Sequence, residues 1–165
     1  MNESAAVFAA VYITLHVAHS VGDHWVQTSC QAAQKGQHDR NPGESSRTGR
    51  LACARHVATL TVTKGLALAA AALVLDLPVT LLGLTLGLAA DAISHYWADR
   101  RTTLQWLAQR CGKGEFYNLG TGAHPAHPVT AKGSPAATLG TGAYALDQSW
   151  HTLWLGIAAL TIAAV

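Results

Sequence analysis

Four long apolar segments divide the chain. They cover about residues 5–26, 51–75, 78–98 and 146–165. Each is close to the length of about 20 mostly apolar residues that a helix needs to cross a bilayer. A soluble helix would carry a polar stripe with a period near 3.6 residues, whereas residues 79–90 carry neither a charge nor such a stripe. The pattern predicts an all-α, polytopic membrane protein, a bundle of four transmembrane helices in a single domain covering residues 1–165. The alternative is a soluble helical bundle with long buried helices.

The connections between these segments differ in length. Asp76–Pro78 is so short that the second and third segments must form an antiparallel hairpin. We expect Pro78 to begin the third helix, because the first helical position needs no N–H donor. The connection before the fourth segment is long and opens with an amphipathic stretch, residues 104–111, that suits the membrane interface. Its Gly- and Pro-rich continuation predicts a flexible loop over residues 112–145, or a lid that folds over a site.

The first segment shares its position in the chain with a secretory signal, but not its other features. Its only charge before the apolar run is Glu3, and the run leads into His16, His19 and Asp23. A signal peptide begins with a positive region and ends at a small-residue cleavage site. We therefore expect a retained helix.

The composition favours a membrane protein as well. Of the 165 residues, 50% are hydrophobic and only 12% are charged, against about 25% charged residues in a soluble domain. The net charge of only +2 lacks the basic footprint of a nucleic-acid-binding protein. We expect membrane lipids, and no nucleic acid, as partners.

Positive residues predict the orientation in the membrane. Lys and Arg gather in the first and last connections, and the N-terminal tail and the short hairpin contain none. Since positive loops face the cytoplasm, both long connections are expected there, with both termini outside a multi-pass protein of the cell membrane. The three cysteines fall on the same side without C-x-x-C spacing, which predicts reduced thiols. The tryptophans also lie near these ends, where indole anchors at the headgroup level: Trp25, Trp97, Trp106, Trp150 and Trp154.

Ionisable residues recur inside the apolar segments, where their cost usually marks a function. Three segments carry a histidine and an aspartate four residues apart, a spacing that places both on one helical face. The predicted orientation puts these pairs and His56 at a similar depth, one to two turns below the inner interface. The pairs are His19 with Asp23, His95 with Asp99, and Asp147 with His151.

Four histidines and three aspartates at one depth predict a site for one or two divalent ions. Imidazole and carboxylate groups bind borderline ions, and helical bundles build di-metal sites from inward-facing side chains. The expected metal is Zn or Mn, and the expected ligands are His19, Asp23, His56, His95, Asp99, Asp147 and His151. Asp23 or Asp147, where not used as a ligand, would serve as general base. The alternative is a purely structural network of hydrogen-bonded His–Asp pairs.

Further polar residues are expected around these ligands. Gln27 and Gln148 would orient ligands or bind substrate. Asp91 lies deepest in the bundle, where it would either hold His95 by a hydrogen bond or stay protonated. Lys64 would either pair with Asp91 or extend its ammonium group toward the membrane surface, that is, snorkel. A disfavoured further ligand is the thiolate of Cys53. The guanidinium groups expected at the mouth, where they would hold a phosphate, belong to Arg55, Arg100 and Arg101.

A strip of small residues follows the third segment. Gly83, Gly87 and Ala90 are three to four residues apart, as in closely packed transmembrane helices. The strip suits either a contact within the chain or a contact between two copies in a homo-oligomer.

These polar elements resemble a known family. The elements that carry the resemblance are His19-x3-Asp23-x3-Gln27, Lys35, His56, His95-x3-Asp99 followed by Arg100, and Asp147-Gln148-x2-His151. From about Val11 to its end, the chain resembles the domain-of-unknown-function 3307 family of small bacterial integral membrane proteins. It is also distantly similar to predicted membrane-bound metal-dependent hydrolases, which share intramembrane His and Asp motifs. Two departures are His24, where the family pattern has an aromatic residue, and the length of the loop after Gly112. The resemblance implies a membrane protein with a polar site, and no established activity.

Two functions of different classes fit the sequence. The first is a metal-dependent hydrolase of a lipid-like or phosphorylated, amphiphilic substrate, because a bound zinc-like ion lowers the pKa of its water to about 7. The second is a non-enzymatic membrane protein, either an ion or metal carrier or an interaction module with a structural polar network. A carrier needs polar groups along its whole path, and the outer halves of the last three segments are nearly free of them.

Overall fold

The computed structural model describes residues 3–120 and 140–165, and all regular structure in these ranges is helical. The predicted all-α class is therefore confirmed. The four long helices are α1 (Glu3–Val21), which continues as a π-helical segment η1 (Gly22–Val26), α3 (Ser46–Leu75), α4 (Leu81–Asp99) and α7 (Gly142–Ala164). The short helices are α2 (Ser29–Gln34), α5 (Thr102–Arg110) and α6 (Gly114–Tyr117).

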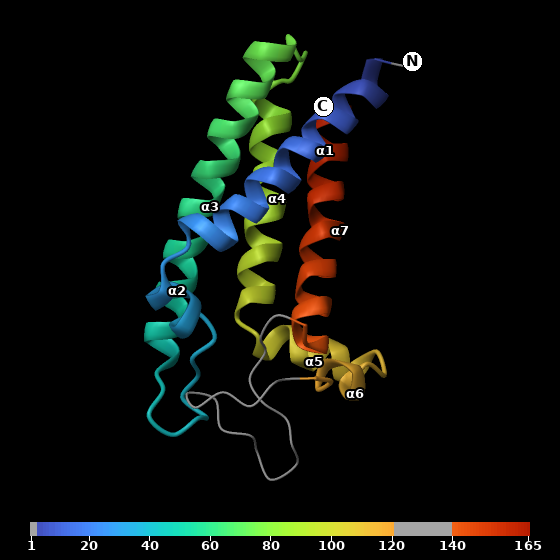
Figure 1. The fold of residues 1–165 in the computed structure, drawn as a ribbon. Helices are drawn as coiled ribbons and strands as arrows, with labels where there is room; N and C mark the ends of the chain where they lie inside the picture. Colours follow the sequence, from blue (N-terminus) through green and yellow to red (C-terminus); the bar gives the residue numbers. More distant parts are fainter. Residues whose placement is uncertain (1–2, 121–139) are drawn as a thin grey trace.

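Helices α3, α4 and α7 lie roughly along one axis, and α1 crosses them obliquely (Figure 1). Both termini lie at the end that holds the α3–α4 turn, and α5 and α6 lie at the opposite end. Two helical segments, Ser4–Val26 and Ser46–Leu75, are long and apolar enough to cross a membrane.

Hydroxyl side chains set the starts of three long helices. Each accepts a hydrogen bond from a backbone N–H of the first turn, which has no partner within the helix. These N-cap residues are Ser45 before α3, Thr80 before α4 and Thr141 before α7. As a result α3 and α7 begin four to five residues earlier than the apolar segments predict, because hydropathy does not register a polar first turn.

The α3–α4 hairpin is antiparallel, as its length predicts (Figure 1). Asp76 ends α3 in the left-handed region, with φ of 50°, and its N–H donates to the carbonyl of Ala72. The prediction that Pro78 begins the next helix is wrong. The helix begins at Leu81 instead, because the Thr80 hydroxyl accepts a hydrogen bond from Gly83 N–H and caps the first turn there.

An apolar core fills the bundle at the end that holds the termini. Its buried side chains come from α1, α3 and α7 and include Leu15, Leu68 and Leu155. The small-residue strip of α4 lies against α7 within the chain: a Cβ on Gly87 would meet Ile162 Cγ1 at 2.6 Å. The close approach of α4 and α7 therefore depends on glycine at this position.

The long connection before α7 is partly helical. The amphipathic stretch predicted over residues 104–111 is helix α5 with its C-cap, and α6 follows it. The predicted loop over residues 112–145 thus contains α6 and the start of α7. Residues 121–139 of that loop, on which the predicted lid falls, lie outside the described residues.

Candidate metal centre

Four buried histidines meet at the level where α1, α3, α4 and α7 approach one another. Their exposed fractions are 4% or less, and the centroids of neighbouring rings lie 4.0 to 5.4 Å apart. They are His19, His56, His95 and His151. The structure thus brings together the imidazoles that the sequence places on four separate helices.

Carboxylates enter the same cluster. Asp23 Oδ1 lies 3.2 Å from His56 Nε2 and 3.8 Å from His95 Nε2. Asp99 Oδ2 lies 3.3 Å and 3.2 Å from the same two nitrogens. Asp147 stands at the edge, with Oδ1 3.4 Å from His151 Nε2.

The spacing of these atoms is typical of ligands that share an ion. His56 Nε2 and His95 Nε2 are 3.1 Å apart, and Asp23 Oδ1 and Asp99 Oδ2 are buried without a hydrogen-bond partner. Two ligands at about 2.0 Å from a tetrahedral zinc lie about 3.3 Å from each other. Two overlapping sets, Asp23 with His56 and His95, and His95 with Asp99 and His151, have the proximity that a metal ion needs.

A local change of helix type places Asp23. The chain passes from α1 into the π-helical η1 at Gly22, and Gln27 N–H donates to the Gly22 carbonyl over 2.9 Å. Single π-helical turns often occur at functional sites because they shift side chains around the helix. A Cβ on Gly22 would clash with Leu60 of α3. Glycine therefore lets η1 approach α3 closely enough for Asp23 to reach His56.

Lys35 belongs to the site, although the predicted site residues do not include it. A capping box between Thr28 and Gln31 starts α2, and Lys35 is the C-cap of that helix. Lys35 Nζ lies 2.9 Å from Asp99 Oδ1. Burial lowers the pKa of Lys35, but the carboxylates of Asp99 and Asp23 outweigh it and hold that pKa above its ordinary value. The side chain therefore stays cationic beside the cluster. In the sequence, the signal for Lys35 is its position among the polar elements that carry the predicted resemblance.

The three arginines expected at the mouth take different positions. Arg100 is buried and donates to the backbone carbonyls of Lys35 and Gln37, the latter over 2.7 Å, so it fixes the connection that follows α2. Arg101 lines a pocket beside the cluster and donates to the Ala32 carbonyl over 3.0 Å. Arg55 is exposed on α3 and is not among the residues that line this pocket.

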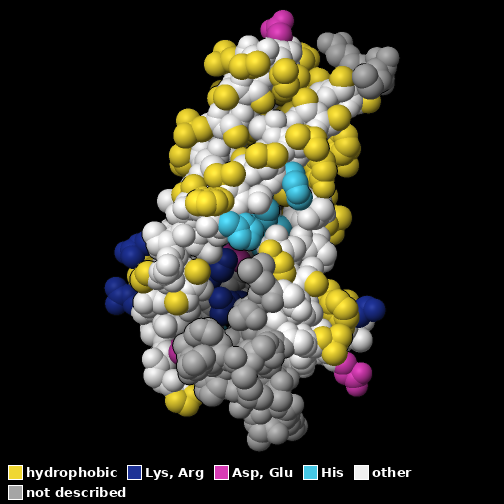
Figure 2. Space-filling view, viewed as in Figure 1, with side chains coloured by type: hydrophobic (Ala, Val, Ile, Leu, Met, Phe, Trp, Pro, Cys, Tyr) yellow, Lys and Arg dark blue, Asp and Glu magenta, His cyan; other side chains and the backbone are white. Residues whose placement is uncertain are grey.

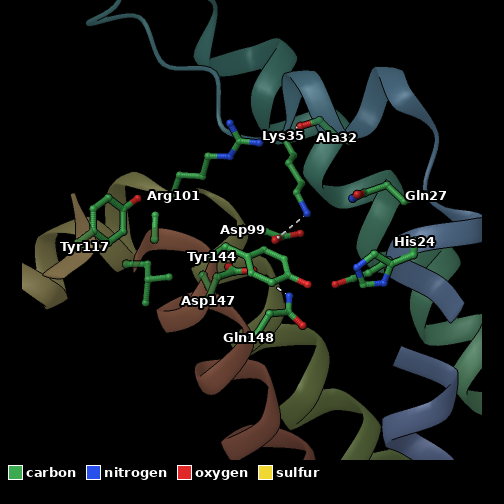
Figure 3. A pocket seen from close by; sticks show the side chains of 14 residues that line it. His24, Gln27, Ala32, Lys35, Asp99, Arg101, Tyr117, Tyr144, Asp147 and Gln148 are labelled. Atoms are coloured by element: carbon green, nitrogen blue, oxygen red, sulfur yellow. Dashed lines mark hydrogen bonds and ion pairs between the residues drawn. The ribbon is translucent and has the colours of Figure 1, made fainter. Parts of the chain in front are cut away.

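The pocket, of about 240 Å³, opens next to the cluster between η1, α2, the end of α4, α5, α6 and α7 (Figure 3). Asp23, Asp99 and Asp147 form part of its wall. Gln27 and Gln148 line it as well, and Gln148 Nε2 donates to Asp147 Oδ2 over 3.3 Å.

Three further polar residues that line the pocket are absent from the predicted site. The first is His24, which lines the pocket, with Nδ1 2.8 Å from the Ser20 carbonyl oxygen. The other two are Tyr117 and Tyr144. Tyr144 lies one helical turn before Asp147 and Gln148, a spacing that marks a shared face. Tyr117 has no such signal in the sequence.

Lys64 and Asp91 form a separate buried ion pair deeper in the bundle. Lys64 Nζ and Asp91 Oδ2 are 2.6 Å apart, and both side chains are at most 3% exposed. Of the alternatives predicted for Lys64, the structure therefore has the pair with Asp91, and the Lys64 side chain does not snorkel. Cys53 is buried with its Sγ 3.6 Å from the Tyr96 carbonyl, so its thiol contacts backbone rather than the cluster.

No family model, curated protein or solved structure matches this chain. The resemblance to the domain-of-unknown-function 3307 family stays a prediction.

Proposed function

We propose that this chain is a four-span protein of the bacterial inner membrane that hydrolyses an amphiphilic substrate with the help of a bound divalent metal, Zn or Mn. The observation that carries the proposal is the buried convergence of imidazole and carboxylate groups from four helices. Several of those atoms have no hydrogen-bond partner among the described residues. Unpaired polar atoms are costly in a buried site, and a metal ion would satisfy them.

The surface supports a membrane location for all four long helices. Large apolar side chains are exposed on each of them, among them Ile13 (60%), Leu66 (68%), Ile93 (72%) and Leu153 (57%). Hydrophobic side chains are spread over the whole upper body in Figure 2, and the visible Lys and Arg side chains lie in the lower half. Exposed apolar side chains along every long helix fit a surface that faces lipid. Helix α3, with 30 residues, is about 45 Å long and exceeds a hydrocarbon core of about 30 Å.

The positive end is the end near the metal centre, which supports a site at the cytoplasmic leaflet. His95 precedes Asp99, the last residue of α4, by about one helical turn, or about 6 Å. Positive loops face the cytoplasm. An amphiphilic substrate would thus reach the site with its polar head at the interface and its tail in the membrane.

Five residues from the two ligand sets would hold an ion, with His19 beside them: Asp23, His56, His95, Asp99 and His151. A bound divalent ion would supply a Lewis acid and a water of lowered pKa. Asp147 is the best placed general base: its side chain is 26% exposed and lines the pocket, whereas that of Asp23 is 9% exposed and lies among the ligands. Asp147 Oδ1 lies 3.4 Å from His151 Nε2, so this carboxylate is adjacent to the ligand cluster.

The same geometry argues against the carrier alternative. Beyond the Lys64–Asp91 pair, the interior is formed by the apolar core of α1, α3 and α7. An ion that crossed the bundle would have to pass this core without polar ligands. The interaction-module alternative accounts for the two Lys–Asp pairs, but not for the unpaired atoms of the histidine cluster.

Metal analysis of the detergent-purified protein tests the proposal. We expect at least one equivalent of metal per chain in the wild type and in His16→Ala, since His16 is exposed on α1. His95→Ala and His56→Ala should lose it. Asp147→Asn should keep the metal and hydrolyse p-nitrophenyl phosphate about 100-fold or more slowly, the effect of a lost general base. A wild type without stoichiometric metal, or equal metal in His95→Ala, would end the proposal.

A further inference from the structure

The pocket beside the metal centre has an unusual distribution of charge. Its wall holds three carboxylates, which all face the cluster, and two permanent cations, Lys35 and Arg101. Once a single divalent ion neutralises two of the carboxylate charges, the formal balance of the wall becomes positive. A metal-loaded pocket would therefore attract an anion.

Arg101 is held at the rim by strained backbone. Its φ of 57° is in the range that favours glycine, and it lies at the junction where α4 ends and α5 begins. Such strain in a non-glycine residue costs on the order of 1–3 kcal/mol and clusters at functional sites. This backbone turns the chain sharply, so that Arg101 reaches Ala32 of α2 and borders the pocket opposite Asp147 (Figure 3).

Neutral hydrogen-bonding groups complete the wall. Tyr117 and Tyr144 project phenols into it, and Gln148 adds an amide (Figure 3). Burial raises the pKa of Tyr117 above its ordinary value, so its hydroxyl keeps its proton and can donate at neutral pH. Cations with fixed donors are how proteins recognise phosphate oxygens, because charge-assisted hydrogen bonds are the strongest ones available.

We propose that this pocket binds a phosphate monoester, with Lys35 and Arg101 as its cationic ligands and Tyr144 as a donor. The inference rests on the proposed function, because the bound metal is what makes the formal charge of the pocket wall positive. The volume of about 240 Å³ equals that of roughly eight water molecules at ~30 Å³ each. It therefore admits a phosphate group with a few further atoms, and a longer tail must extend out of the pocket.

Calorimetric titration of the Mn²⁺-loaded protein in neutral detergent tests this site. The probes are inorganic phosphate, dihexanoyl phosphatidic acid, which is a monoester, and dihexanoyl phosphatidylcholine, which is a diester. We expect both monoester-type anions to bind, and the zwitterionic diester to bind at least tenfold more weakly. Tighter binding of phosphatidic acid than of phosphate identifies a lipid headgroup as the ligand, and equal binding identifies the phosphate group alone.

Variants assign the binding to the pocket. Arg101→Met should weaken phosphate binding about tenfold or more, as expected when a charged hydrogen bond is lost, with the metal content unchanged. Tyr144→Phe should weaken it severalfold and leaves the backbone at Arg101 untouched. Arg110→Met, a matched control on the same helix at an exposed position outside the pocket, should bind like the wild type.

The failures of the two proposals are distinguishable. Stoichiometric metal without phosphate binding, equal affinity in Arg101→Met and Arg110→Met, or equal binding of the diester would overturn the phosphate site alone. A protein without metal whose phosphate affinity still falls in Arg101→Met would retain the anion site and refute the metal-dependent hydrolase.

Discussion

The Lys64–Asp91 pair offers the sharpest test of the packing. The two charges are 2.6 Å apart, and Lys64 is fully buried between α3 and α4. Removing one partner of a buried pair leaves an uncompensated charge and typically costs about 3–5 kcal/mol, whereas replacing both by apolar residues of similar volume is often neutral or stabilising. We therefore expect Lys64→Met and Asp91→Leu each to be destabilised by about 3–5 kcal/mol. The double variant should return close to the wild type.

Thermal unfolding in detergent measures this cycle. For a chain of this size, 1 kcal/mol corresponds to about 2–4 °C in Tm, so each single variant should unfold about 6–20 °C below the wild type. Lys113→Met, which removes an exposed lysine outside the bundle, should leave Tm within a few degrees of the wild type. The double variant should also keep its metal, because the pair lies apart from the ligand cluster.

A double variant as unstable as either single variant would refute this reasoning. It would mean that the two charges act independently and that the 2.6 Å contact is not what stabilises them.

Two further predictions concern helix packing and the loop before α3. Gly87→Ala should cost about 1–3 kcal/mol of stability by overpacking, because its Cβ would meet Ile162 of α7 at 2.6 Å. Gly65→Ala has open space around it and should be neutral or stabilise α3 by up to about 1 kcal/mol. Equal changes in Tm for the two variants would contradict the close contact between α4 and α7. Asp39 accepts a hydrogen bond from Ser46 N–H over 2.8 Å, and this bond lowers the pKa of Asp39 below its ordinary value of 3.8. The contribution of the ionised Asp39 to stability should be complete above pH 3.8 and lost as the pH falls through the lowered pKa. Asp39→Asn should therefore flatten the acid limb of a plot of Tm against pH. An unchanged acid limb would show that the hydrogen bond between Asp39 and Ser46 does not form.

Part of the fold follows from local sequence alone. The apolar segments are long enough to specify helices without reference to the rest of the chain, and the short Asp76–Pro78 link leaves only an antiparallel hairpin. The spacing of four residues likewise places His95 above Asp99 on one face, because the α-helical period is a local property. A polar first turn is local as well, but its hydroxyl caps carry no hydropathy signal, so the helix starts were misplaced.

The composition of the site was decided by tertiary structure. Whether Asp23 reaches His56 depends on the close approach of Gly22 to Leu60, two residues 38 positions apart in the sequence. No periodicity within one helix encodes that contact.

The sequence by itself determined the helical class, the apolar segments and the pairing of histidine with aspartate on each helical face. Only the packed structure decided which side chains share one space: it brought Lys35 to Asp99, engaged Arg100 with backbone carbonyls, and put Arg101 at the rim of the pocket. The physical reason is that backbone periodicity fixes neighbours within a helix. Neighbours between helices depend on how closely the surfaces of those helices can approach.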